Sequence, residues 1–310
     1  MRTITLRHKI VSSTFTLPIM AVVSVLLWML PNITSFDLWL GLVATGLNTY
    51  LIMELNNRNA LLRIRSRMMS VTYLALMLAC PALHTFKLSA VPALCLTLAY
   101  FMLFASYQQL RAEGYVFHAF LALGIGSLVF PPLLVLALAY YICMLFQLRV
   151  FNWRTFVASI LGIAVPYWVK AGHGMWQNSL DTEFAYLEPW FELQLPHYDL
   201  LTPNQWVTLG FVFVLSLLAF IHFIHTAYND KIRTRMLLYA VAVVEVFLAV
   251  GIVLLPQCYD MQLHLFIANS SLLIAHHYTL GKGRFFDAWF YLNILLLVAL
   301  GAFNYCEGFF

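Results

Sequence analysis

The sequence contains very little charge. Only 10% of its 310 residues are Asp, Glu, Lys or Arg, against roughly 25% in an average soluble domain, while 63% are hydrophobic. So few charged side chains could not cover a soluble protein of this length, whereas a bilayer accepts an apolar outer face. The composition therefore predicts an integral membrane protein. The basic residues form no contiguous patch, which argues against binding of nucleic acid.

Catalytic and metal-binding motifs are also missing. The chain has no GxSxG, P-loop, GxGxxG or HExxH motif. Its five cysteines lack CxxC spacing, so neither a structural zinc nor an attached haem is expected. Cys258 and Cys306 fall near helix ends on the same side, and the sequence leaves open whether they pair. We expect no metal and no cofactor, and the absent motifs favour a non-enzyme while leaving the question open.

Apolar runs divide the chain into about 11 predicted transmembrane helices, most of them close to the roughly 20 residues that span a bilayer. We expect these helices at 11–30, 37–54, 67–83, 88–107, 115–130, 132–148, 153–170, 204–226, 234–256, 261–280 and 286–305. The fifth and sixth meet at Pro131-Pro132 and form either a tight hairpin or a re-entrant pair, so the number is 9–11. The predicted fold is all-α, a polytopic α-helical membrane protein in which residues 1–310 form one integral membrane domain.

The basic residues alternate from linker to linker. One set of linkers holds fifteen of the seventeen Lys and Arg residues, and the other set holds only Lys87 and Lys170. The fifteen are Arg2, Arg7, Lys9, Arg58, Arg63, Arg65, Arg67, Arg111, Arg149, Arg154, Lys231, Arg233, Arg235, Lys282 and Arg284. Because cytoplasmic loops carry the excess of Lys and Arg, we expect the N-terminus in the cytoplasm, the C-terminus outside and a multi-pass location in a bacterial inner membrane.

Acidic residues concentrate in the predicted outside (periplasmic) loop at 171–203, which is also rich in aromatic residues. Ser179 followed by Asp181 and Glu183 is typical of a helix start. We expect one or two short interfacial helices here, with Pro189 ending the first of them. The loop serves either as an anchor in the membrane interface or as a lid or docking surface.

Glu245 lies in the middle of an apolar run, where an ionisable side chain is costly and therefore a functional candidate. Polar residues on the adjacent predicted helices accompany it: His222, His264, Asn269, Ser270 and Ser271. This intramembrane polar cluster predicts either a proton or ion relay, or a headgroup-binding pocket, or hydrogen bonds that fix helix packing.

An arginine-rich segment precedes the third predicted helix and contains Arg58, Arg63, Arg65 and Arg67. Two interpretations stay open. The arginines orient the chain and attract anionic lipid, or they recognise a phosphate or lipid headgroup, because the guanidinium offers fork-shaped donors.

The stretch from Leu51 to Lys170 carries a family resemblance. The segment LNNRNALLRIRSRMMS, Pro131-Pro132, Phe151-Asn152-Trp153-Arg154 and Pro166-Tyr167 resemble an uncharacterised family of polytopic inner-membrane proteins from Bacteroidota. The same stretch is similar, more distantly, to the membrane module of the GT-C glycosyltransferases. That resemblance implies an enzyme that takes a sugar from a polyprenyl-phosphate lipid on the outer side of the membrane.

The chain departs from the GT-C pattern in its first outside loop. GT-C enzymes carry an acidic motif in a long loop there, whereas this loop spans only about 31–36 and is followed by a single Asp37. Asp181, Glu183 and Glu188 of the later loop are the other candidate catalytic carboxylates.

Three functions follow from these patterns. The first is a non-catalytic subunit or scaffold of a membrane protein assembly, with the bilayer and other membrane proteins as partners. The second is a GT-C-like transferase that uses a polyprenyl-phosphate-linked sugar. The third is a transporter or flippase with a path past Glu245.

Overall fold

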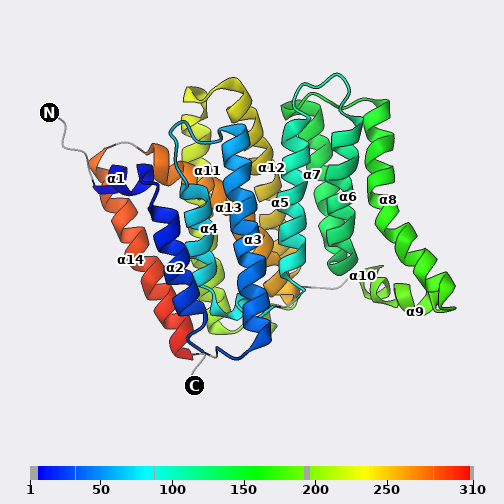
Figure 1. Cartoon of the computed structure of the whole chain (residues 1–310), viewed down its shortest axis with the longest axis horizontal. Helices are drawn as coiled ribbons and strands as arrows, with labels where there is room; N and C mark the ends of the chain where they lie inside the picture. The colour runs from blue at the N-terminus through cyan, green and yellow to red at the C-terminus, as the bar shows by residue number, and fades with distance from the viewer. Residues whose placement is uncertain (1–5, 32, 87, 192–195, 282, 308–310) are drawn as a thin grey trace.

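The computed structural model describes residues 6–31, 33–86, 88–191, 196–281 and 283–307, and in these ranges every regular element is a helix. Most of the helices run side by side along one direction (Figure 1). Each of the eleven expected segments contains a helix. These are α2 (Thr16–Trp28), α3 (Phe36–Asn59), α4 (Met68–Leu78), α5 (Ala90–Ala105), α6 (Glu113–Val129), α7 (Leu136–Ile142), α8 (Trp153–Trp176), α11 (Pro203–Thr226), α12 (Ile232–Leu254), α13 (Tyr259–Leu280) and α14 (Arg284–Glu307).

Five helices are long and apolar enough to cross a membrane, namely α3, α8, α11, α12 and α14. A sixth candidate is the pair of α1 (Leu6–Ser12) and α2, which pass the same test together. The helices α4, α5, α6 and Pro131–Gln147 are apolar but only 10–17 residues long. By length and composition the protein thus has five to six candidate spans, fewer than the eleven expected. The expected segments 67–83, 88–107, 115–130 and 132–148 hold these shorter helices, and α13 (Tyr259–Leu280), although 22 residues long, is not among the candidates.

The first expected helix, at 11–30, is broken. α1 and α2 meet at an angle of 84°. At the break the Thr16 hydroxyl donates to the Ile10 carbonyl at 2.6 Å, and the Phe15 N–H donates to the Ser13 hydroxyl at 3.1 Å. Ser and Thr side chains that bond to nearby backbone groups compete with the regular helical hydrogen bonds. The polar residues before α2 therefore turn the chain where the sequence predicted one straight helix.

The fifth and sixth expected helices form a hairpin. After α6 the chain turns through a short 3₁₀ helix, Pro131–Val135, continues as α7 and ends in a π-helix, Cys143–Gln147. Beyond it, the Leu148 carbonyl accepts a hydrogen bond from the Gln108 N–H at 3.1 Å. Gln108 precedes α6, so the second arm returns to the level at which the first one started. Both arms therefore contribute to the bundle along its full height.

The helix α13 occupies the centre of the bundle. It packs against α4, α5, α11 and α12, and its residues are buried almost without interruption from Tyr259 to Tyr278. A helix that is buried on all sides has no solvent-facing stripe. Yet α13 carries polar side chains on several faces, among them Gln262, Asn269 and His276. These groups must find their partners inside the protein.

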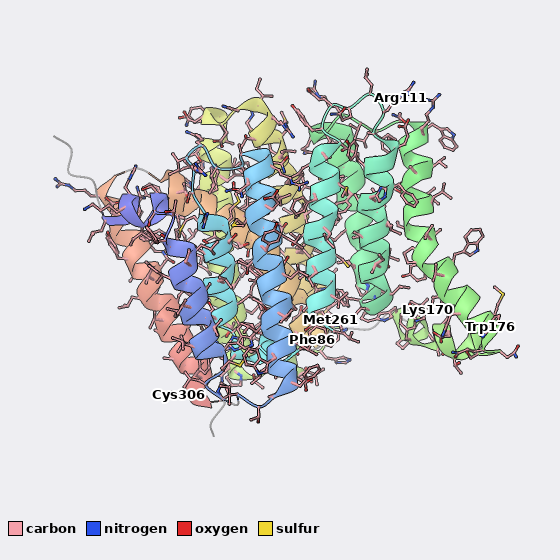
Figure 2. All side chains as sticks on the ribbon, in the orientation of Figure 1. Phe86, Arg111, Lys170, Trp176, Met261 and Cys306 are labelled. Atoms are coloured by element: carbon pink, nitrogen blue, oxygen red, sulfur yellow. The ribbon has the colours of Figure 1, made fainter. Side chains whose placement is uncertain are left out.

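Basic linkers meet at one end of the bundle. The linker after α3 contacts the one before α12, since the Arg63 side chain pairs with Asp230 and Arg233 donates to the Asn59 side chain at 3.3 Å. At the same end Arg7 contacts Asp287 at 2.8 Å, beside the linker before α14. Figure 2 places Arg111 at this end and Lys170 at the opposite one. Arg2, Lys87 and Lys282 lie outside the described residues.

The loop at 171–203 contains the expected short helices. α9 (Leu180–Phe184), a 3₁₀ turn Ala185–Leu187 and α10 (Glu188–Phe191) follow the end of α8, and a second 3₁₀ turn covers Tyr198–Leu200. Pro189 does not end the helical structure as the sequence suggested. It lies in the first turn of α10, where the missing N–H of proline costs no hydrogen bond.

Cysteine pairing is absent. All five cysteines lie among the described residues and all are free. Cys258 is half-buried and Cys306 is exposed at the end of α14, whereas Cys80, Cys95 and Cys143 are buried packing residues.

Two glycines of α3 test the packing of this helix. A Cβ atom at Gly41 would lie 1.9 Å from the His84 carbonyl oxygen, whereas a Cβ at Gly46 would meet no atom within 4 Å. We expect Gly41→Ala to lower the free energy of unfolding by about 1–3 kcal/mol through overpacking. The matched change Gly46→Ala should be neutral or raise it by up to about 1 kcal/mol through helix propensity. Thermal unfolding of both variants in detergent checks this, and equal melting temperatures would contradict the close α3–His84 contact.

Candidate functional site

Glu245 is buried in the middle of α12, with 4% of its surface exposed. The Ser216 hydroxyl of α11 donates to its Oε1, and the Asn269 side-chain amide of α13 donates to its Oε2. The same amide also donates to the Val241 carbonyl at 3.1 Å. Tyr100 of α5 donates its hydroxyl to Asn269 Oδ1. Four helices are thus joined through one group, which we name the Glu245 cluster: Tyr100, Ser216, Glu245 and Asn269.

Hydrogen bonds, not a cation, hold the Glu245 carboxyl. Among the described residues no Lys, Arg or His forms an ion pair with it. A buried polar group costs stability unless it is hydrogen-bonded, and here both carboxyl oxygens have a donor. The arrangement therefore suits a fixed interhelical junction.

The other predicted members of the polar cluster lie elsewhere. His264 contacts the Asp260 carbonyl at 3.1 Å, towards the outer end of α13. The Ser271 hydroxyl donates to the Ala268 carbonyl of its own helix at 2.9 Å, and Ser270 is buried beside it. His222 lies near the C-terminal end of α11 (Pro203–Thr226), at the basic end of the bundle. The structure thus brings together only Glu245 and Asn269 of the residues that the sequence grouped.

Apolar side chains separate the Glu245 cluster from both ends of the bundle. Towards the outer end, Phe213 of α11 stacks on Phe266 of α13 with ring centroids 6.2 Å apart. Towards the basic end, Leu272 and Leu273 of α13 are buried, with 1% and 0% of their surface exposed. Apolar side chains thus flank the Glu245 cluster along α13, with Ser270 and Ser271 buried next to Asn269 on the same helix.

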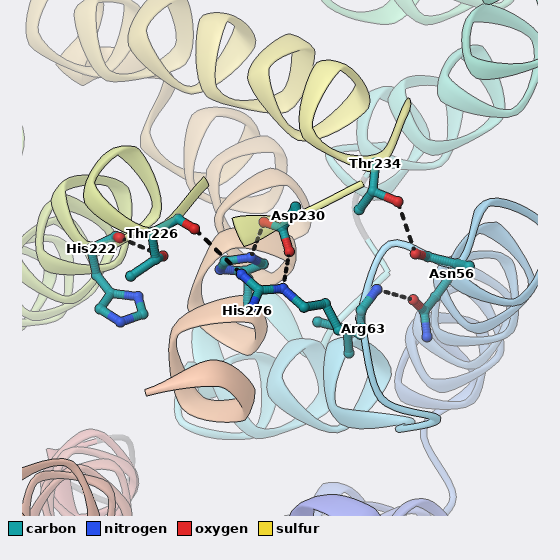
Figure 3. Close-up of polar contacts among 9 residues, drawn as sticks. Asn56, Arg63, His222, Thr226, Asp230, Thr234 and His276 are labelled. Carbon is teal, nitrogen blue, oxygen red and sulfur yellow. Dashed lines mark hydrogen bonds and ion pairs between the residues drawn. The ribbon is translucent and has the colours of Figure 1, made fainter. Parts of the chain in front are cut away.

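A second polar group joins the basic linkers, and we name it the Asp230 cluster: Arg63, Asp230 and His276 (Figure 3). Asp230 pairs with Arg63 through one carboxylate oxygen, and His276 Nε2 contacts the other at 3.0 Å. Arg63 also donates to the Thr226 carbonyl at 3.3 Å. Burial raises the pKa of Asp230, but the hydrogen bonds from His276 and Arg63 outweigh it and hold the pKa below its usual value.

The four arginines proposed for phosphate binding are not equivalent. Arg63 is held by the Asp230 cluster, and Arg58 pairs with Glu54 of its own helix at 2.8 Å. Arg65 and Arg67 are exposed. The segment acts first as the connector between α3 and α4. It leaves two arginines facing outwards, where anionic lipid headgroups would be.

The candidate catalytic carboxylates are scattered. Asp37 is exposed in the first turn of α3, and Glu188 is exposed in α10. Glu183 contacts His173 at 3.3 Å and Lys170 at 4.0 Å. Asp181 lies in α9, but its side chain is outside the described part of the chain. Within the described residues no group of three or more His, Cys, Asp or Glu side chains could hold a metal ion.

Two cavities open in the outer half of the bundle. One cavity of about 560 Å³ lies at the outer ends of α11, α13 and α14, and its largely apolar walls include His84, Tyr259 and Asn304. His84 stacks on Trp28 with ring centroids 3.7 Å apart, and burial lowers its pKa to about 4. An apolar cavity of about 970 Å³ lies beside the α6–α7 turn. None of the described carboxylates lines either cavity.

Sequence reasoning missed most partners in these clusters. Tyr100 and Ser216 are single polar residues within apolar runs, and Asp230 follows an ordinary helix end. The sequence signal for such residues is a polar side chain inside an apolar run. This signal does not tell which other helix supplies the hydrogen-bond partner.

Comparisons with protein-family models, with curated proteins and with solved structures found no match. The resemblance of residues 51–170 to other polytopic membrane proteins thus stays a prediction from the sequence pattern.

Asp230 gives the protein a pH-dependent contribution to stability. Asp230→Asn removes the ion pair with Arg63 and should lower the free energy of unfolding at pH 7 by about 1–3 kcal/mol. The folded pKa lies below the unfolded value of about 3.9. The contribution is therefore complete above about pH 5 and is lost as the pH falls through the folded pKa.

Thermal unfolding of the purified protein between pH 7 and pH 3 measures this contribution. The difference between wild type and Asp230→Asn should be constant above about pH 5 and shrink below about pH 4. Asp199→Asn is the matched control, because Asp199 is exposed, and it should change stability little at any pH. A difference between wild type and Asp230→Asn that does not vary with pH would contradict the ion pair.

Proposed function

We propose that the chain is a non-catalytic subunit or scaffold of a protein assembly in the bacterial inner membrane. The observation that carries this proposal is that the polar groups of two interior clusters bond to one another across helices. The Glu245 cluster uses both carboxyl oxygens in this way, and the Asp230 cluster does the same at the basic end. An enzyme or transporter would instead direct such groups at a substrate cavity.

The proposed topology has eleven crossings, with the N-terminus in the cytoplasm and the C-terminus outside. Grouping of the basic linkers at one end of the bundle supports it, through the contacts of Arg63 with Asp230, of Arg233 with Asn59 and of Arg7 with Asp287. By the positive-inside rule that end faces the cytoplasm. Helices shorter than a full span, such as α4, are enclosed by neighbours that cross completely.

Two edge helices support a role in assembly. α14 and α8 lie at opposite edges of the bundle (Figure 1). Their apolar windows are only 17% and 28% buried inside the protein. Large side chains project from both, including Val298 of α14 and Trp168 of α8, which are 68% and 79% exposed. Lipid or the helices of a partner would cover these faces, and we propose that one of the two edges receives a membrane-protein partner.

A GT-C-like transferase has less support. Its chemistry needs a carboxylate in a cavity that is open to the outer leaflet. Asp37 and Glu188 are exposed outside both cavities, and Glu183 is engaged with Lys170 and His173. Transport or lipid flipping has less support as well, because the Phe213–Phe266 stack lies between the Glu245 cluster and the outer end.

Native purification tests the proposal. A tagged chain expressed in its own host and extracted in mild detergent should elute with a stoichiometric membrane-protein partner. Replacing Trp168 and Val298 separately by Asp should release the partner in one case, with the released form still folded by its thermal unfolding. The matched change Tyr228→Asp, at a residue that is 74% exposed at the basic end, should leave the complex intact. A chain that elutes alone and still supports its host would contradict the subunit role.

Substitutions at the candidate carboxylates test the two alternatives. We expect Asp37→Ala, Glu188→Ala and Glu245→Gln each to retain the partner and to support growth of the host as the wild type does. Glutamine keeps the size of Glu245 and one acceptor oxygen for Asn269, and its NH₂ group could donate to the Ser216 hydroxyl, but it cannot carry the charge. Loss of host function with a stably folded Asp37→Ala or Glu188→Ala would favour the transferase, and such a loss with Glu245→Gln would favour transport.

A further inference from the structure

The apolar cavity is almost as long as one bilayer leaflet is thick. Its walls come from the α6–α7 turn, from Tyr167 of α8, from Trp190 of α10, and from α12 and α13. On α12 the lining runs from Val246 to Leu254, which is about 12 Å along a helix axis. Half of a hydrocarbon core of about 30 Å is roughly 15 Å. The length of the cavity along α12 is thus comparable with, and slightly shorter than, the thickness of one leaflet of the hydrocarbon core.

The walls of this cavity are suited to hydrocarbon. Aromatic and aliphatic side chains such as Phe130, Phe247 and Leu265 dominate them, and Gln262 contributes one amide. The volume of about 970 Å³ lies at the upper end of the range for sites that enclose a small molecule. Among the residues that the structure describes, no Asp, Glu, Lys, Arg or His lines it, so these walls suit an uncharged, apolar part of a ligand.

A lysine that is paired with a glutamate lies next to the outer rim of the cavity. Lys170 follows Tyr167 by three residues, so both lie on the same face of α8. The Lys170 ammonium lies 3.7 Å from the centroid of the Tyr186 ring and 4.0 Å from the Glu183 carboxylate. Tyr186 directly precedes Leu187, which lines the cavity. Figure 2 places Lys170 towards the outer end of α8.

A hydroxyl donor accompanies the ammonium. The Tyr186 hydroxyl is buried and has no hydrogen-bond partner within the described residues. Burial raises the pKa of Tyr186, so the phenol keeps its proton at neutral pH. Among the basic side chains that the structure describes, Lys170 is the one at this end of the bundle. An ammonium and a phenol O–H are donors that a phosphate accepts.

We propose that the apolar cavity holds an anionic glycerophospholipid of the outer leaflet, with acyl chain in the cavity and phosphate at Lys170 and Tyr186. The length of the cavity is similar to the thickness of one leaflet, and the Lys170 ammonium lies next to its rim. Both features favour a lipid over the apolar segment of another protein. The site is independent of the proposed subunit role, since it would exist in the isolated chain.

Titration of the delipidated full-length protein in detergent tests this. Dioleoylphosphatidylglycerol is the probe, and native mass spectrometry counts the molecules retained by each chain. We expect one site that saturates first. Lys170→Gln should weaken it about tenfold, the loss of one charge-assisted contact. Val250→Trp, which fills the cavity from α12, should weaken it similarly, whereas Lys231→Gln removes an exposed basic residue at the opposite end and should leave it unchanged.

Two results would overturn the proposal. Equal retention of the probe by Lys170→Gln, Val250→Trp and Lys231→Gln would show that the lipid binds elsewhere. Displacement of phosphatidylglycerol by an equimolar amount of undecaprenyl phosphate would show that the cavity binds a polyprenyl phosphate in preference to a glycerophospholipid. Failure of either kind leaves the partner experiment above unaffected, because that experiment reads co-elution of a protein.

Discussion

Hydrogen bonding of the polar side chains of α13 is the constraint on which the rest of the structure depends. In hydrocarbon no water satisfies a polar group, so a hydrogen bond inside the protein is strongly favoured, although the side chains of Ser270 and His277 of α13 have no hydrogen-bond partner among the described residues. Asn269 meets this demand by joining α5, α12 and, through Glu245, α11. His276 meets it by contacting Asp230, which also binds the linker after α3. A central helix of Leu and Val alone would pack equally well against several faces of its neighbours, whereas these bonds allow one arrangement.

In this arrangement the polar side chains of the two clusters bond to one another and do not line either cavity. Buried apolar residues such as Phe266 and Leu273 flank the Glu245 cluster along α13. Buried hydrogen bonds within membrane proteins typically contribute about 0.6 kcal/mol each, and up to about 1.7. Contributions of this size, added over several bonds, help to select one helix arrangement. The outer half of the bundle, with its two cavities, is where a ligand can be accommodated.

The sequence predicted the fold well where the signal was local. Length and hydropathy located a helix in each of the eleven segments, although only five to six of these helices are candidate membrane spans. The orientation that the basic residues predict stays a prediction. The sequence-based prediction failed where a few side chains override the hydropathy pattern. Ser13 and Thr16, for example, break the first expected helix. Tyr100 and Ser216 could not be identified, since their partners are 169 and 29 residues away in sequence. Glu245 stood out because a charge in an apolar run is visible without knowledge of its neighbours.

The central claim is that Glu245 stabilises helix packing through Asn269. A double-mutant cycle measures it most directly, with Glu245→Leu, Asn269→Leu and the double variant compared with wild type by reversible unfolding in detergent. The account predicts that each single change lowers the free energy of unfolding by about 1–3 kcal/mol, because it leaves the partner buried without its bond. The double change should cost about 0.6–1.7 kcal/mol less than the sum of the two. Strictly additive effects, or single variants as stable as the wild type, would contradict the account.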